Sequence, residues 1–148
     1  MSGSVIALIG AGLCAALCGC GSAWGVMSAG RAAAGVTSEK PDLFGKLIIL
    51  EALPGTQGIY GFLVAILVLA KVNAGITADQ GLALLAATLP MTVVGFLSAI
   101  AQSKAAVAAI HMTGKQPDAS GKGITITAMV ETYAIIALLA SILLLTKV

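Results

Sequence analysis

Residues 124–145 read ITITAMVETYAIIALLASILLL, an apolar run with one formally charged side chain, Glu131. Lys122 and Lys147 stand on either side of it. About 20 apolar residues suffice for a helix to cross a bilayer, whereas barrel strands are about ten residues long and alternate with polar ones. A helix also satisfies its own backbone hydrogen bonds in lipid. The run therefore predicts a membrane-spanning helix.

Three similar runs precede it, at about 5–29, 47–70 and 81–109. The chain is 59% hydrophobic and only 9% charged, against about 25% charged in an ordinary soluble domain. Such a chain cannot cover a globule with a wettable surface, which excludes a soluble enzyme. A net charge of +2 without a basic cluster excludes a nucleic-acid partner. The expected fold is an all-α membrane protein with four transmembrane helices.

The chain also repeats itself after a shift of 76 residues. Residues 66–72 (ILVLAKV) then fall on 142–148 (ILLLTKV), and the Pro-Asp and Gly-Lys pairs of 41–46 fall on those of 117–122. Because each half crosses the membrane twice, both halves have the same orientation. This indicates a tandem duplicated helical hairpin, a parallel repeat.

The repeat divides the chain into a first hairpin at 1–72, a short loop at 73–80 and a second hairpin at 81–148. Glu131 belongs to the second hairpin and falls on Gly55 of the first. Only the second hairpin is therefore expected to carry a mid-helix carboxylate.

Basic side chains are concentrated in two of the connections. The segments 31–46 and 104–122 carry three each, six of the eight in the chain. Cytoplasmic loops are enriched in Lys and Arg. The loops 31–46 and 104–122 are therefore expected to be cytoplasmic, with both termini and the loop 73–80 outside, in a multi-pass protein of the cell membrane.

Small residues are frequent on the first and third helices. Gly21 and Gly25 give a small-xxx-small spacing next to Gly19, and six alanines lie within 99–109. Small residues allow membrane helices to approach closely. The pattern is typical of the tightly packed inner layer of an oligomer, and ordinary packing within a monomeric bundle is the alternative.

Glu131 carries the chemistry of the chain. It lies about 12 Å along the helix from Lys122, at 1.5 Å per residue. An unpaired carboxylate at this depth costs several kcal/mol, so it is protonated, paired with a cation or facing a wet path. A helix-end acid that reaches the interface is the simpler alternative.

The second helix offers polar partners for this acid. Leu53, Thr56, Gln57 and Tyr60 are spaced i, i+3, i+4 and i+7, so they share one helical face. Pro54 cannot donate to the carbonyl of residue 50, which loosens the backbone there. The small residue at 55 leaves room for the acid or an ion.

Gln102 on the third helix adds a further amide oxygen. With Glu131, Thr56, Gln57 and one freed carbonyl, about five hard oxygens are available, a set that suits non-transition cations. One negative charge favours Na⁺ or H⁺ over Ca²⁺. Na⁺ is the preferred ion, because a proton needs only the carboxylate, and H⁺ alone remains the alternative.

Two stretches together resemble a known family. Residues 53–62 (LPGTQGIYGF) and 129–134 (MVETYA) are strongly similar to the K subunit (the c, or proteolipid, subunit) of bacterial V-type and archaeal A-type rotary ATPases. The similarity extends over essentially the whole chain. It implies a membrane ring of identical subunits, each carrying an ion on its mid-helix carboxylate.

For sodium-translocating members, the resemblance implies a defined ligand set. The ligands would be the Leu53 backbone carbonyl, Thr56, Gln57, Gln102 and Glu131. It also implies a hydrogen bond from Tyr60 to the carboxylate. The choice of Leu53 rests on the resemblance alone, since the position of Pro54 points to the carbonyl of residue 50.

The resemblance implies several partners as well. These are a static membrane subunit that supplies a cationic residue, the central stalk subunits and the lipid bilayer. The chain itself has no G-x-x-x-x-G-K-[ST] phosphate loop, so we expect a non-catalytic subunit of an ATP-driven complex. A proton-coupled small multidrug-type exporter and a passive pore are the rival functions. An exporter would need an aromatic-lined cavity, and only 4% of the residues are aromatic. The role of Glu51 is open between an interfacial acid, an entry path and a second site.

Overall fold

The computed structural model describes residues 2–148, and these form helices joined by short turns. The first span is a single helix, and so is the third. The second span is interrupted, and the fourth begins with one short turn. In chain order the elements are α1 (Gly3–Glu39), the 3₁₀ turn η1 (Pro41–Leu43), α2 (Phe44–Ala52), the 3₁₀ turn η2 (Leu53–Gly55), α3 (Thr56–Leu69), α4 (Ala78–Lys115), the 3₁₀ turn η3 (Pro117–Ala119) and α5 (Ser120–Leu145).

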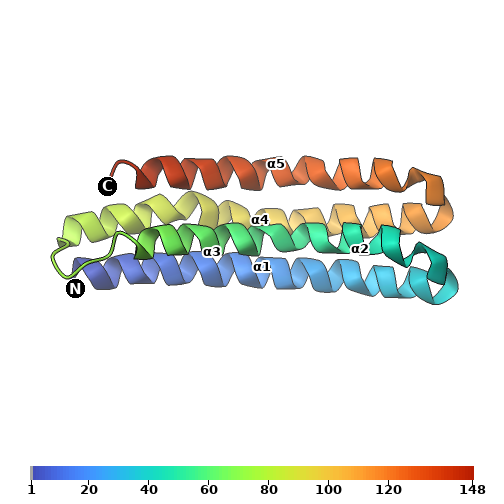
Figure 1. Ribbon diagram of the computed structural model, residues 1–148, viewed down its shortest axis with the longest axis horizontal. Coiled ribbons are helices and arrows are strands. Elements are labelled where there is room, and N and C mark those ends of the chain that lie inside the picture. The colour runs from blue at the N-terminus through green and yellow to red at the C-terminus, as the bar shows by residue number, and fades with distance from the viewer. Residues whose placement is uncertain (1) are drawn as a thin grey trace.

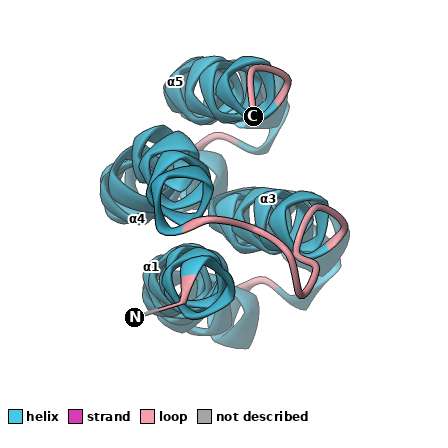
Figure 2. Ribbon diagram, turned by 90° about the vertical axis from the view of Figure 1, so that its left-hand side faces the viewer, coloured by secondary structure: helices cyan, strands magenta, loops and turns pink. Residues whose placement is uncertain are grey.

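The four spans lie side by side as rods and alternate in chain direction, so the N and C marks fall at the same end of the bundle (Figure 1). Seen end-on, α1 and α4 are neighbours, α3 lies beside both, and α5 lies against α4 on the far side (Figure 2). The two halves of the chain are thus placed next to one another in the same orientation. This confirms the duplicated hairpin.

Each rod is long and apolar enough to cross a membrane. The four candidate spans are Gly3–Glu39, Pro41–Leu69, Ala78–Lys115 and Pro117–Leu145, with mean hydropathy between 1.7 and 2.2. Large apolar side chains such as Ile59, Phe62 and Leu143 are exposed on the outside of the bundle. That is the arrangement expected of helices surrounded by lipid rather than water, and it confirms the predicted fold class.

The connections are shorter than the charge pattern indicated. The segments 31–46 and 104–122 are mostly helical, because α1 continues to Glu39 and α4 to Lys115. Each helix stops two residues before a proline, Pro41 or Pro117, which begins a 3₁₀ turn. Charges mark where the apolar run ends, whereas the backbone turns only where proline removes the α conformation from the preceding residue.

The middle loop is also displaced from 73–80. The helix α3 ends at Leu69, and α4 already begins at Ala78. Thr77 caps α4, since its side chain accepts from the Gln80 backbone N–H while the Gln80 side chain accepts from the Thr77 backbone N–H. This capping box satisfies free N–H groups at the helix start.

Small residues set the spacing between the rods. A Cβ on Gly21 would lie 2.8 Å from the Phe96 carbonyl oxygen of α4, and a Cβ on Gly25 would lie 2.6 Å from Cβ of Pro54. A Cβ on Gly19 would meet nothing within 4 Å. Close packing within the chain therefore accounts for Gly21 and Gly25 but not for Gly19.

Candidate ion-binding site

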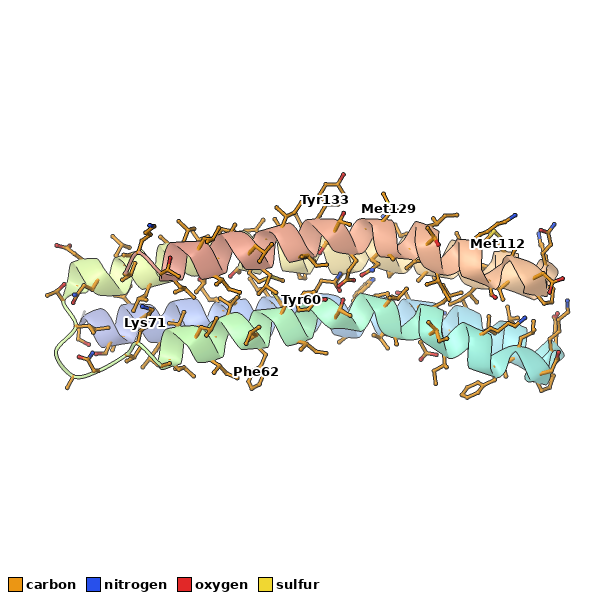
Figure 3. All side chains as sticks on the ribbon, turned by 45° about the horizontal axis from the view of Figure 1, so that its top comes forward. Tyr60, Phe62, Lys71, Met112, Met129 and Tyr133 are labelled. Atoms are coloured by element: carbon orange, nitrogen blue, oxygen red, sulfur yellow. The ribbon has the colours of Figure 1, made fainter. Side chains whose placement is uncertain are left out.

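Glu131 points into the bundle from the middle of α5. It is 9% exposed, whereas Met129 and Tyr133, two residues away on either side, are 63% and 65% exposed. Both of these neighbours point away from the helices (Figure 3). Residues two apart on a helix lie on nearly opposite faces, so the carboxylate is held inside. The alternative of a helix-end acid at the interface is wrong.

Two side chains from other helices bind one oxygen of this carboxylate. Oε2 of Glu131 accepts from Oγ1 of Thr56 at 2.8 Å and from Nε2 of Gln102 at 2.8 Å. The other oxygen, Oε1, is buried and has no hydrogen-bond partner among residues 2–148. A buried acceptor without a partner is costly, so this oxygen is available for a ligand or a proton.

The two glutamines link the helices around the acid. Nε2 of Gln57 donates to Oε1 of Gln102 at 2.6 Å, and both side chains are fully buried. Nε2 of Gln102 also donates to the backbone carbonyl of Thr127 at 3.2 Å. Thr127 was missed by the sequence analysis, although its position one turn before Glu131 places it on the same face of α5.

Four oxygens, one of them Oγ1 of Thr56 itself, form a cluster at this residue. Its Oγ1 lies 2.8 Å from Oε2 of Glu131, 3.0 Å from the Leu53 carbonyl oxygen and 3.3 Å from Oε1 of Gln57. A hydroxyl carries one proton, so it donates to one of these three acceptors at a time. The other two acceptors receive no proton from this hydroxyl. Such a cluster suits a hard cation, which prefers oxygen ligands.

The interruption of the second span explains how a backbone carbonyl comes to the cluster. The 3₁₀ turn η2 contains Pro54, which has no N–H, and the Thr56 N–H bonds the Leu53 carbonyl. This bond spans three residues rather than four and draws the carbonyl toward Thr56 Oγ1. The carbonyl beside the cluster is therefore that of Leu53, and the position of Pro54 taken alone indicated the wrong one.

Tyr60 and Glu51 stand apart from these contacts. The half-buried Tyr60 lies beside Glu131 and Thr56, between the two layers of helices (Figure 3). The hydrogen bond from Tyr60 to Glu131 stays a prediction. Glu51 lies against α1, where its Oε1 would be 2.8 Å from a Cβ on Gly30.

The sequence was compared with protein families and with curated proteins. It matches the family of the ATP synthase C subunit twice, over residues 9–68 and 85–144. The two matches fall on the two hairpins and cover most of the chain. They agree with the duplication found in the sequence and in the helix arrangement.

Curated relatives belong to rotary ATPases. The chain is 44% identical to V-type sodium ATPase subunit K of Enterococcus hirae, over 96% of this chain and 91% of that protein. It is 41% identical to A-type ATP synthase subunit K of Methanocaldococcus jannaschii, over 96% of this chain and 64% of that protein. Identity to the V-type proton ATPase 16 kDa proteolipid of Bos taurus is 27%, over 97% and 93% of the two chains. The chain therefore belongs to the ATP synthase C-subunit family, as a double-hairpin member similar to subunit K.

Proposed function

We propose that this chain is the ion-translocating rotor-ring subunit of a V-type or A-type rotary ATPase and carries one Na⁺ on Glu131. The observation that supports this most directly is the oxygen cluster around Thr56, next to a buried carboxylate oxygen that has no hydrogen-bond partner among the described residues. The relative from Enterococcus hirae is named as a sodium ATPase subunit. Exporter and pore functions have no counterpart among these relatives.

The proposed ligands are the clustered oxygens together with Oε1 of Gln102, which accepts from Gln57 Nε2 in this structure and would exchange that bond for the ion. They are the Leu53 carbonyl, Thr56 Oγ1, Gln57 Oε1, Gln102 Oε1 and one oxygen of Glu131. Gln57 already presents its Oε1 toward Thr56. A site for H⁺ alone needs only the carboxylate, whereas this site gathers further oxygens of the kind that a hard cation prefers. Na⁺ is therefore favoured over H⁺.

The bound ion also explains how the acid passes through lipid. Carboxylate and Na⁺ together are neutral, which removes most of the cost of an intramembrane charge. At a static subunit, a cationic side chain would replace the ion and release it to a water path. The chain's own residues bind and release the ion, and ATP chemistry belongs to other subunits of the complex.

The number of sites per helix sets the gearing of such a rotor. This chain supplies one mid-helix carboxylate per four helices, because Gly55 stands where a second would be. Fewer ions per turn leave more free energy for each ion, and moving one charge costs about 2.3 kcal/mol per 100 mV. The arrangement suits pumping against a steep gradient.

The repeat indicates how identical copies form the ring. A groove between α4 and α5 is lined by Val94, Leu97, Ser98, Ala101, Val130 and Tyr133. The residues 76 positions earlier include Gly21 and Gly25, which α4 covers within the chain. We infer that α1 of the next copy covers the α4–α5 groove in the same way.

Orientation follows from the charges at the two ends of the bundle. The turns at 40–43 and 116–119 lie at the end opposite the chain termini (Figure 1), close to four of the eight basic residues, Lys40, Lys46, Lys115 and Lys122. By the positive-inside bias this end faces the cytoplasm. It is the surface that the central stalk subunits would contact.

Carbodiimide labelling of membranes that contain the assembled ATPase tests the proposed ion. The reagent is expected to modify Glu131, and added Na⁺ is expected to slow the modification at near-neutral pH. If the labelling rate does not depend on Na⁺ but falls as pH rises, the transported ion is H⁺ rather than Na⁺. A membrane current through the isolated ring would instead support a passive pore.

A further inference from the structure

A hydrogen bond outside the oxygen cluster joins α1 to the start of α3. The Gly58 backbone N–H donates to Oγ of Ser22 at 2.8 Å. Ser22 is 6% exposed and comes from α1, which supplies no oxygen to the cluster. In the sequence it stands out only as a small residue between two glycines.

The reason for this bond is the break in the second span. Gly58 is the third residue of α3, and the first four N–H groups of a helix have no acceptor within that helix. In a membrane no water replaces the missing acceptor. The Ser22 hydroxyl does so from a neighbouring helix, as an N-cap side chain does from its own.

Two close contacts hold α1 against the break. A Cβ on Gly58 would lie 3.2 Å from Cβ of Ser22, and a Cβ on Gly25 would lie 2.6 Å from Cβ of Pro54. Ser22 therefore holds the chain at Gly58, and Gly25 packs against it at Pro54. Thr56 and Gln57, which carry two of the clustered oxygens, lie between these two points.

We propose that Ser22 is a positioning residue of the ion site, which holds the first turn of α3 so that Thr56 and Gln57 keep their oxygens directed at the ion. This inference rests on the Na⁺-carrying function proposed above. Ser22 is not among the proposed ligands, because its oxygen accepts from the Gly58 N–H and lies outside the oxygen cluster. Ser22 affects the geometry of the ligand oxygens, and hence their affinity for Na⁺.

The repeat supplies a matched control. Ser98 stands 76 positions after Ser22, is similarly buried at 7% exposed, and donates to the carbonyl of Gly95 in its own helix at 3.3 Å. The residue that corresponds to Gly58 is Ala134, in the interior of the unbroken α5. Its N–H has an acceptor within the helix, so Ser98 has no equivalent task.

The test compares Ser22→Ala with Ser98→Ala in membranes containing the complete ATPase. The measurement is the Na⁺ concentration that halves carbodiimide labelling of Glu131. Loss of one buried hydrogen bond is expected to raise this midpoint about threefold to tenfold for Ser22→Ala. Ser98→Ala should keep the wild-type midpoint, and the labelling rate without Na⁺ should be unchanged in both.

Each outcome decides between distinct ideas. Wild-type labelling that ignores Na⁺ contradicts the proposed function itself. A wild-type chain protected by Na⁺, with an unchanged midpoint in Ser22→Ala, contradicts only the role of Ser22. A Na⁺ midpoint that shifts equally in Ser22→Ala and Ser98→Ala also contradicts the role of Ser22. Should Ser22→Ala fail to assemble, Ser22→Cys keeps the size with a weaker acceptor, and an unchanged midpoint there also overturns the inference.

Discussion

Oγ1 of Thr56 lies 2.8 Å from Oε2 of Glu131, although 75 positions separate the two residues. That separation is one short of the repeat, so the contact joins nearly equivalent points of the two hairpins. Thr132, the true counterpart of Thr56, is exposed and bonds the Met129 carbonyl of its own helix. The two halves have therefore diverged, one supplying the acid and the other a broken helix with free oxygens.

Glu131→Gln is expected to abolish Na⁺ transport. The amide retains hydrogen bonds to Thr56 and Gln102 but loses the charge that cancels the ion. The measurement is ATP-driven uptake of radioactive Na⁺ by vesicles containing the assembled ATPase. Glu51→Gln is the matched control, since Glu51 lies against Gly30 outside the cluster. Uptake at the wild-type rate by Glu131→Gln would refute the assignment of the site.

Thr56→Val is expected to weaken Na⁺ binding by more than tenfold. The change removes the oxygen at the centre of the cluster, and hydrogen bonds to charged groups contribute about 1.5–3 kcal/mol. The readout is again the Na⁺ midpoint for protection of Glu131 from carbodiimide. Thr132→Val, at the equivalent exposed position, should leave the midpoint unchanged. Equal shifts of the Na⁺ midpoint in the two variants would show that Thr56 is not a ligand of the ion.

Most of the fold was predictable because its signals are periodic and strong. Four long apolar runs predicted the four spans, and the 76-residue repeat predicted two hairpins of the same orientation. The ends of α1 and α4 were not predictable from charge, because helix continues through residues 31–39 and 104–115. Only proline at 41 and 117 marks those ends.

The sequence predicted which side chains would meet around Glu131, but it did not predict the bonds between them. Spacing placed Thr56 and Gln57 on one face, and depth singled out Glu131. The carbonyl of Leu53 depends on how the chain turns at Pro54, and several turns are compatible with one proline. The roles of Thr127 and Ser22 depend on contacts between helices, which no pattern within one helix contains.

Pro54→Ala is expected to lower Na⁺ affinity without lowering the thermal stability of the ring. Proline in a helix interior costs about 3 kcal/mol, so alanine favours a continuous helix through η2. The Leu53 carbonyl would then bond the Gln57 N–H and turn away from Thr56. Pro90→Ala, within α4 and away from the oxygen cluster, is the control that should keep the Na⁺ midpoint. An unchanged midpoint in Pro54→Ala would mean that this carbonyl is not a ligand.

Leu97→Cys is expected to form a disulfide with Cys20 of the next copy. Within the chain, Phe96 of α4 packs against Gly21 of α1. Leu97 is the counterpart of Gly21 in the repeat, and Cys20 is the counterpart of Phe96. In the contact between copies, Leu97 therefore meets Cys20 of the next α1, with the larger side chain now on position 97. Leu97 is 57% exposed and Cys20 is exposed in the single chain, as an open interface requires.

Mild oxidation of membranes should convert Leu97→Cys into a ladder of linked copies on a non-reducing gel. The same change combined with Cys20→Ser should remove the ladder. Phe62→Cys, on a side chain that points away from the bundle (Figure 3), should form no link to Cys20, because α3 carries it toward lipid. A ladder from Phe62→Cys but none from Leu97→Cys would mean that neighbouring copies meet through α3, and the register inferred from the repeat would be wrong.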